Sequence, residues 1–203
     1  MTRLFLATTN PAKQQTLQWA TEGFGFAYHA AGDRAGTREV EERGAMFIEN
    51  AVQKAVSWSE EVPDLVVATD GGMAIPALGE RWNPLETHRF AGPDASDEDR
   101  VRAVLDLLRP YRGKERYVYW TEAVAFAKAG KKLAAWEVRG DEGHLAESYK
   151  PEHVIPGFWT AAIWLSDGFD RVYAELTEEE RHLVPSAWQR LKPLVQGFLR
   201  NSS

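Results

Sequence analysis

The feature that most constrains the fold is an apolar run near the start of the chain that passes at once into a helix. Residues 3–8, RLFLAT, form a short apolar run with large side chains, which is typical of a buried strand. Asn10 is a favourable N-cap, and Pro11 takes the first helical position, where a missing N–H does no harm. A strand that enters a helix through a tight polar turn indicates an α/β protein.

The rest of the chain continues this alternation. Helices are predicted at residues 11–21, 45–59, 96–108, after Thr177, and 185–199. Strands are predicted at residues 3–8, 24–30, 64–69, 116–127 and 132–138, the last two as a possible hairpin. The charged residues 33–44 and the Gly- and Pro-rich residues 71–84 predict loops, the second with room for one short strand. Early alternation followed by local strand pairing predicts an α/β chain with a mixed sheet.

Composition limits the class of protein. Of 203 residues, 44% are apolar and 27% charged, which supports one domain over residues 1–203 with a substantial core. A net charge of -6 without a long basic run argues against a nucleic-acid polymer as partner. The lack of cysteine excludes disulfides, thiolate zinc sites and cysteine nucleophiles. No apolar stretch reaches membrane-spanning length and the N-terminus lacks a signal-peptide pattern, so we expect a cytoplasmic protein.

The first candidate site is the turn between the first strand and the first helix. A helix N-terminus attracts anions through its free N–H groups and its dipole, and Thr8, Thr9 and Asn10 add side-chain donors. Lys13 lies in the first helical turn, where a cation is unfavourable unless an anion is bound nearby. A phosphate-binding turn is one interpretation. A plain capped helix with a solvated lysine is the other, and it is favoured by this stretch alone.

A second candidate group lies on the helix predicted at residues 45–59. Phe47, Asn50 and Lys54 share one helical face because they are three and four residues apart. Glu41 and Glu42 precede this helix in the loop. A solvated charged helix is the alternative.

Asp70 is the third candidate, because it ends an apolar strand and is followed by two glycines. In open α/β sheets, ligands gather beyond the carboxyl ends of the strands, and glycines allow close approach. A carboxylate there is suited to bind magnesium or to act as a general base, although an Asp–Gly turn is the simpler alternative. Together with Lys13, Lys54 and the Glu41/Glu42 pair, Asp70 indicates a phosphate–magnesium site.

In this order, these pieces resemble the inosine/xanthosine triphosphate pyrophosphatase family, house-cleaning enzymes that remove aberrant purine nucleotides. The family's T-x-N-x-x-K turn is matched by Thr8, Asn10 and Lys13. Its E-x-G-x-x-F-x-E-N-A-x-x-K-A helix is matched by Glu42, Gly44, Phe47, Glu49, Asn50, Ala51, Lys54 and Ala55. Its D-D-S-G segment is similar to TDGG, with Asp70 on the second aspartate, and Arg89 falls on the arginine of a later A-L-G segment. The resemblance runs from about residue 3 to 199.

The chain departs from the family pattern in its second half. The G-F-G-Y-D-P segment appears as GFWTAA at residues 157–162, and S-H-R appears as PSA at residues 185–187. Thr69 stands at the first aspartate of the pair. In the family the lost groups grip the purine and help to hold the triphosphate. The phosphate and metal half of the site therefore looks kept, and the half that recognises the base looks rewritten.

The resemblance implies Mg²⁺-dependent (or Mn²⁺-dependent) hydrolysis of a nucleoside triphosphate, such as ITP, XTP or one with an altered base, to the monophosphate and pyrophosphate. Asp70 would be the general base and contact the metal, which Glu42 would also bind. The substrate would be held by Thr8, Thr9, Asn10, Lys13, Lys54 and Arg89, the last of which would alternatively support the cleft wall. Trp159 would stack on a base or fill the core. The alternative is an inactive relative that binds nucleotide or serves as a dimeric interaction module.

The same resemblance implies an elongated mixed sheet flanked by helices, in two lobes around a central cleft, and a homodimer. Eight tryptophans favour core and interface packing. Four cationic residues near the altered segments are able to replace the missing groups, although surface roles are the simpler alternative: Lys150, His153, Arg181 and His182.

Overall fold

A computed structural model describes residues 2–33, 40 and 42–201 of the chain. Its strands are β1 Arg3–Leu6, β2 Ala27–Ala30, β3 Leu65–Ala74, β4 Tyr117–Lys128, β5 Lys131–Leu145 and β6 Trp164–Ser166. Its α-helices are α1 Pro11–Ala20, α2 Phe47–Glu61, α3 Asp97–Leu107, α4 Glu178–Leu183 and α5 Ala187–Asn201. Short 3₁₀ helices are η1 Ala31–Asp33, η2 Pro76–Arg81, η3 Pro84–Glu86, η4 Gly113–Arg116, η5 Pro151–His153, η6 Trp159–Ala162 and η7 Tyr173–Glu175.

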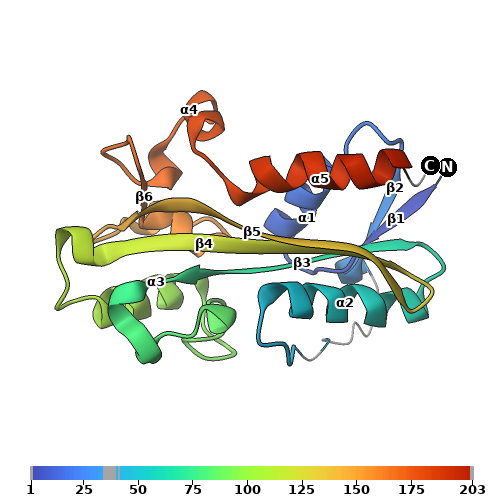
Figure 1. The fold of residues 1–203 in the computed structure, drawn as a ribbon. Helices are drawn as coiled ribbons and strands as arrows, with labels where there is room; N and C mark the ends of the chain where they lie inside the picture. Colours follow the sequence, from blue (N-terminus) through green and yellow to red (C-terminus); the bar gives the residue numbers. More distant parts are fainter. Residues whose placement is uncertain (1, 34–39, 41, 202–203) are drawn as a thin grey trace. The chain divides into compact units, whose positions relative to one another are not determined.

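The strands form one six-stranded sheet in the order β2-β1-β3-β4-β5-β6 (Figure 1). β1 pairs in parallel with β2 and β3, whereas β5 and β6 are antiparallel, so the sheet is mixed as predicted. β4 and β5 are joined through Ala129 and Gly130, both at positive φ. A two-residue connection of this kind makes an antiparallel hairpin.

Most element boundaries follow local signals. Asn10 caps α1, Ser96 caps α3 and Thr177 caps α4, each through its side chain as predicted. Several boundaries were predicted wrongly. β1 ends at Leu6 instead of residue 8, β2 begins at Ala27 instead of residue 24, and β5 continues to Leu145 instead of residue 138. β3 continues through Asp70 and both glycines to Ala74. Asp70 is therefore inside a strand and not at its end.

The chain divides into two compact units, each made of segments that are distant in sequence. The first unit comprises residues 1–71, 122–138 and 187–203, and the second comprises residues 72–121 and 139–186. Whether residues 1–203 behave as one domain with a central cleft stays a prediction. Within the described residues, no helix combines the length and the apolar character needed to cross a membrane.

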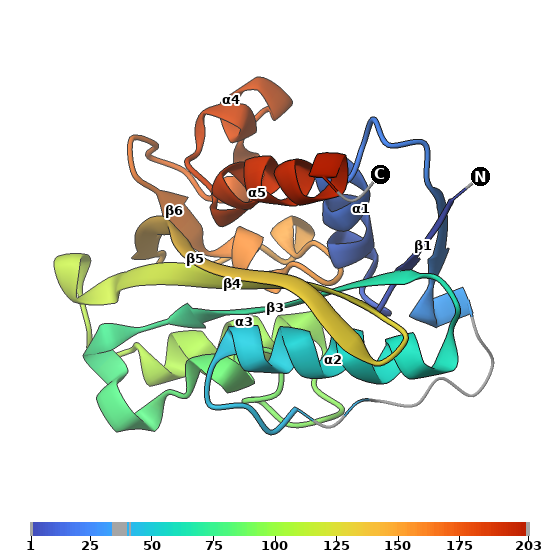
Figure 2. The same cartoon turned by 45° about the vertical axis from the view of Figure 1, so that its right-hand side comes forward.

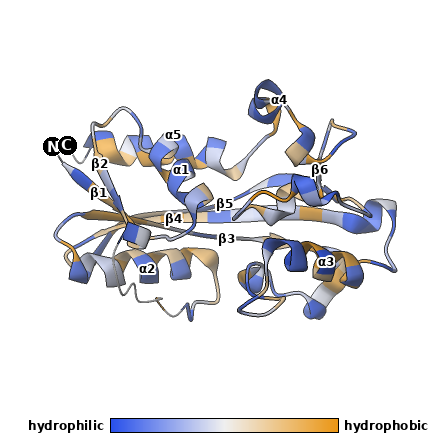
Figure 3. Ribbon diagram, turned by 180° about the vertical axis from the view of Figure 1, so that it is seen from behind, coloured by the Kyte–Doolittle hydropathy of each residue, from blue (hydrophilic) through white to orange (hydrophobic). Residues whose placement is uncertain are grey.

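Alternating side chains along the strands cover both faces of the sheet in the first unit. Leu4 and Leu6 pack with buried residues of α1 and α5, whereas the ring of Phe5 lies 5.0 Å from that of Trp58 in α2. α1 and α5 thus lie on one face and α2 on the other, as two views show (Figure 1 and Figure 2). Colouring by hydropathy shows α5 as amphipathic (Figure 3), and its buried residues recur every four positions: Ala187, Leu191, Val195 and Leu199.

The second unit has its own core, in which α3 and η6 pack together. Trp82, Trp159 and Trp164 are all buried in this core. These three tryptophans therefore serve packing in the core.

Candidate active site

The turn after β1 is tightly bonded to itself. The Thr8 amide donates to the Leu6 carbonyl at 2.8 Å, and the Asn10 amide donates to Thr8 Oγ1 at 3.2 Å. Gln14 Nε2 donates to the Thr8 carbonyl at 3.1 Å. These bonds hold the residues between β1 and α1 in one conformation.

Asn10 uses its side chain to cap α1. Asn10 Oδ1 accepts from the amides of Ala12 at 2.9 Å and Lys13 at 3.3 Å. The prediction of several free N–H groups at this turn is therefore wrong for these amides. Among residues 8–13, all of which the structure describes, Thr9 is the one residue whose amide N–H has no acceptor. Pro11 has no N–H. An anion at this turn would bind mainly that amide and the side chains.

Lys13 lies at the start of the buried stripe of α1. It is four residues before Leu17 and seven before Ala20, and both of these are fully buried against the sheet. The side chain of Lys13 is half-buried, and within the described part of the chain its ammonium group has no ion pair. The cation is therefore available to a bound anion.

The start of α2 is built around Gly44. The Gly44 amide donates to Asn50 Oδ1 at 2.8 Å, and a Cβ at this glycine would lie 2.7 Å from both Asn50 Oδ1 and Glu49 Cβ. Glu49 accepts from the amides of Ala45 and Met46, and Glu137 of β5 accepts from the Ile48 amide at 2.8 Å. Only glycine permits this close packing of the loop on the helix.

Asn50 and Lys54 project from α2 onto Asp70 of β3. Lys54 Nζ donates to Asp70 Oδ1 at 3.1 Å and to Glu42 Oε1 at 2.7 Å. Asn50 Nδ2 donates to Asp70 Oδ2 at 3.1 Å. Asp70 is only 6% exposed, and its two carboxylate oxygens are oriented by the buried Asn50 and the half-buried Lys54. Glu41, the other acid of the predicted pair, lies outside the described residues.

The donor set suits a hard divalent cation. Glu42 and Asp70 both approach the ammonium of Lys54, so these two carboxylates are the described groups that could hold a metal ion here. Mg²⁺ prefers carboxylate oxygens and usually needs only one or two of them, with waters and phosphate oxygens as its other ligands. Within the described residues, no group of three or more acidic or histidine side chains forms a complete protein cage.

The turn and this network flank the same point of the sheet. The Ala7 amide donates to the Val67 carbonyl at 2.8 Å, so β3 runs on past the end of β1 towards Asp70. Lys54 and Asp70, both predicted site residues, meet here, whereas no role was predicted for Asn50. The signal for Asn50 was its spacing of four residues from Lys54 on one helix face.

Two predicted site residues belong to the second unit. Arg89 is exposed, and its amide donates to the Glu86 carbonyl at 2.7 Å. Trp159 is 3% exposed in the core, with its ring 5.9 Å from that of Phe90. This burial supports core filling for Trp159, because a base cannot stack on a ring that is already covered.

The four cationic residues near the altered segments also lie in the second unit. Lys150 and His153 both approach Glu175, at 2.9 Å and 3.7 Å. The guanidinium of Arg181 lies over the Tyr173 ring and donates to the Ala174 carbonyl, and His182 is exposed. Local contacts of this kind support surface and packing roles for Lys150, His153 and Arg181.

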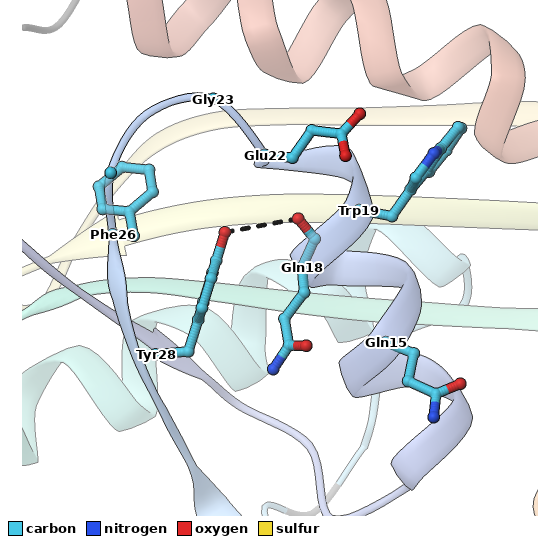
Figure 4. A pocket seen from close by; sticks show the side chains of 8 residues that line it. Gln15, Gln18, Trp19, Glu22, Gly23, Phe26 and Tyr28 are labelled. Carbon is cyan, nitrogen blue, oxygen red and sulfur yellow. Dashed lines mark hydrogen bonds between the residues drawn. The ribbon is translucent and has the colours of Figure 1, made fainter.

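A surface depression beside α1 is distinct from these groups. Its lining includes Gln15, Gln18, Trp19 and Tyr28, with the Tyr28 hydroxyl donating to the Gln18 carbonyl (Figure 4). None of the predicted site residues lines it. Lys192 already covers one face of Trp19, at 3.8 Å from the ring centroid.

The fold and the site together define an α/β protein with a mixed six-stranded sheet and a lysine–carboxylate network beside its first strand. The chain belongs to the Ham1 family, whose sequence profile matches residues 4–190. This confirms the predicted family.

Named relatives and solved structures agree with this assignment. A dITP/XTP pyrophosphatase of Bacillus subtilis (strain 168) is 29% identical over 96% of both chains. One of Lactococcus lactis is 30% identical, over 95% of this chain and 94% of that protein. A HAM1 protein from Coxiella burnetii has the same fold, with a TM-score of 0.78 at 23% identity over 97% of this chain and all of that one. A structure described as nucleoside-triphosphatase / dITP/XTP pyrophosphatase from Mycobacterium abscessus has a TM-score of 0.68 at 27% identity, over 89% and 92% of the two chains.

Proposed function

We propose that the protein hydrolyses a nucleoside triphosphate to a nucleoside monophosphate and pyrophosphate, with an aberrant purine nucleotide or one with an altered base as substrate. The observation that carries this proposal is the hydrogen-bonded network of Glu42, Lys54, Asp70 and Asn50. The names of the Bacillus subtilis and Lactococcus lactis relatives, which match nearly the whole chain, support the same activity.

Asp70 is the proposed general base. Its two oxygens accept from Lys54 and Asn50, which sets the orientation of the carboxylate, and each oxygen keeps a lone pair for a water molecule. The base takes a proton from the water that attacks the α-phosphorus. The bond from this phosphorus to the bridging oxygen then breaks, and pyrophosphate leaves.

Lys13 and Lys54 are the proposed phosphate-binding cations. Thr8, Thr9 and Asn10, in the turn between β1 and α1, are further proposed contacts with the substrate. A phosphoanhydride carries several negative charges, so positioned cations lower the barrier by neutralising charge that develops on the leaving group. Lys54 already bridges two carboxylates at 2.7 and 3.1 Å. Arg89 is a further proposed contact with the substrate.

A divalent metal ion, with Mg²⁺ as the proposed ion and Mn²⁺ as a substitute, would be held by Glu42 and Asp70. When bound, it would neutralise phosphate charge and polarise the scissile bond. Glu42 is otherwise an acceptor for Lys54, at 2.7 Å.

A second candidate function is nucleotide binding without turnover, which is favoured by the loss of the family's S-H-R and Y-D groups at residues 185–187 and 160–161.

The deciding experiment is a panel of nucleoside triphosphates, including ITP, XTP and dITP, assayed for pyrophosphate release with Mg²⁺ and with Mn²⁺. We expect release of pyrophosphate and no release of single phosphate ions. Substrates that bind in calorimetry but are never hydrolysed would overturn the catalytic proposal in favour of the binding function.

We also propose a cytoplasmic homodimer. Nucleoside triphosphates are abundant in the cytoplasm, so the activity fits that compartment. Light scattering on the purified protein tests the dimer, and a monomer mass at micromolar concentrations contradicts it.

A further inference from the structure

Glu122 is a buried acid that the proposed site leaves without a role. It lies near the middle of β4 and is 4% exposed. The hydroxyl of Thr69, on the neighbouring strand β3, donates to Glu122 Oε1 and also lies 2.8 Å from the Ala123 carbonyl. A charged carboxylate is rarely buried unless charge or hydrogen bonds compensate it.

Both residues face α1. Val67 and Val124 belong to the cluster that contains Leu17 of α1. Thr69 is two residues beyond Val67 and Glu122 is two before Val124, so strand alternation puts both side chains on that face. Asp70 points to the opposite face, where it meets α2.

Glu122 also lies at the level of the turn after β1. Leu6 pairs with Val67, so Thr69 stands beyond the last residue of β1, level with Thr8. Lys13 begins the stripe of α1 that packs on this face, and side chains of a helix lean towards its N-terminus. The buried carboxylate and the ammonium of Lys13 are therefore directed to the same end of this face.

We propose that Glu122 is a positioning residue that acts through Lys13. Held by the Thr69 hydroxyl, its carboxylate supplies the counter-charge that draws the Lys13 side chain over the end of β1, where the cation meets the leaving phosphates. The proposal rests on the proposed function. In the family pattern, position 69 carries an aspartate, whereas this chain has Thr69 there and the buried acid Glu122 on the neighbouring strand β4.

The first test replaces the charge with an amide, as Glu122→Gln. If Glu122 positions Lys13, inorganic pyrophosphate binds about tenfold more weakly in calorimetry, and kcat/KM falls by a similar factor. If Glu122 only adds negative charge near the phosphates, its removal tightens pyrophosphate binding instead. The matched control is Glu61→Gln, an exposed acid at the end of α2, which should alter neither value.

The second test moves the carboxylate from position 122 on β4 to position 69 on β3. Thr69→Asp alone puts two acids side by side in a buried place, so we expect a lower melting temperature. The double variant Thr69→Asp with Glu122→Gln should recover pyrophosphate affinity and kcat/KM towards those of the unchanged protein. A purely structural role for Glu122 would give recovery of stability without recovery of pyrophosphate affinity.

Thr69→Val keeps the proposal testable if Glu122→Gln does not fold. It removes the hydroxyl that holds Glu122 and leaves the acid, so pyrophosphate affinity should fall about threefold. Unchanged affinity in every variant that folds overturns the positioning role. The two proposals can fail separately. If the protein without substitutions releases no pyrophosphate from any nucleotide, but its affinity for pyrophosphate still depends on Glu122, only the catalytic proposal is overturned.

Discussion

At the scale of single residues, Asp70 is held by Asn50 and Lys54, each of which donates to one of its two oxygens. Asp70→Asn places a side-chain N–H group against one of these two donors and removes the proposed base. We expect pyrophosphate release to fall at least about 100-fold. We also expect the free energy of unfolding to fall by no more than about 1–3 kcal/mol. The loss is limited because Glu42 still pairs with Lys54. Steady-state assays and urea unfolding measure the two effects.

The control for this substitution is Asp64→Asn, which removes the exposed ion pair with Arg3 at 3.0 Å. We expect unchanged activity and a stability loss below about 1 kcal/mol. Full activity in Asp70→Asn together with a large stability loss would mean that Asp70 is a structural residue.

Lys54 is the cation that Glu42 and Asp70 share. Lys54→Met keeps the length and removes the charge, so the two carboxylates repel each other and the melting temperature without metal falls. Mg²⁺ should then raise the melting temperature of this variant more than that of the unchanged protein, because the ion replaces the missing ammonium. Thermal denaturation over a magnesium titration measures this difference. Equal shifts in both proteins would argue against a metal on these carboxylates.

At the scale of elements, the first turn of α1 combines a cap with the proposed phosphate contact. Asn10→Asp keeps a good N-cap but brings a negative charge to the turn, so we expect stability close to that of the unchanged protein and a raised KM. Asn10→Ala loses the cap and should lower the free energy of unfolding by about 1 kcal/mol. Urea unfolding and steady-state kinetics on both variants separate the two roles. A KM unaffected by Asn10→Asp contradicts phosphate binding at this turn.

α4 provides a test of pH dependence. The Thr177 amide, followed by the Arg171 guanidinium, donates to Glu180 and holds the pKa of this carboxyl below its ordinary value. A pKa lowered by folding means that the unfolded chain binds the proton more tightly, so the stabilisation is complete above the ordinary value and is lost as pH falls through the folded one. Glu180→Gln should therefore lower the melting temperature at pH 7, and the difference should shrink as the pH falls below about 4.3. A difference that is constant between pH 7 and pH 2 contradicts this.

At the scale of the whole molecule, the proposed phosphate and metal groups all belong to the first unit, and the rewritten segment at residues 157–162 belongs to the second. Phosphate contacts are the same for every nucleotide. Lys13→Ala should therefore lower kcat/KM by one common factor for all substrates in the panel. A factor that varies strongly with the base would place Lys13 in base recognition instead.

Much of this architecture was predictable because its signals are local. The caps at Asn10, Ser96 and Thr177 are hydrogen bonds between residues two or three positions apart, so a short stretch of sequence contains both partners. The order of helices and strands, and the spacing of Asn50 and Lys54 on one face, are local for the same reason.

Strand lengths and buried partners depended on residues far away in the chain. Gly71 and Gly72 favour a turn by themselves, yet β3 continues through them because neighbouring strands extend alongside it. The sequence left two roles for Trp159, stacking on a base and packing in the core. Its burial beside Phe90 supports packing. Glu122 gave no signal at all, because its contact with Thr69 joins positions 53 residues apart.

The amino-acid sequence alone indicates which chemical groups are present, where the capped helices α1, α3 and α4 begin, and to which family the chain belongs. Tertiary structure decided which of these groups meet. Lys54 reaches Glu42 across 12 residues and Asp70 across 16, and Asn50 reaches Asp70 across 20. Contacts of this kind form only when helix α2 packs on β3, because no local preference of the backbone brings such distant side chains together.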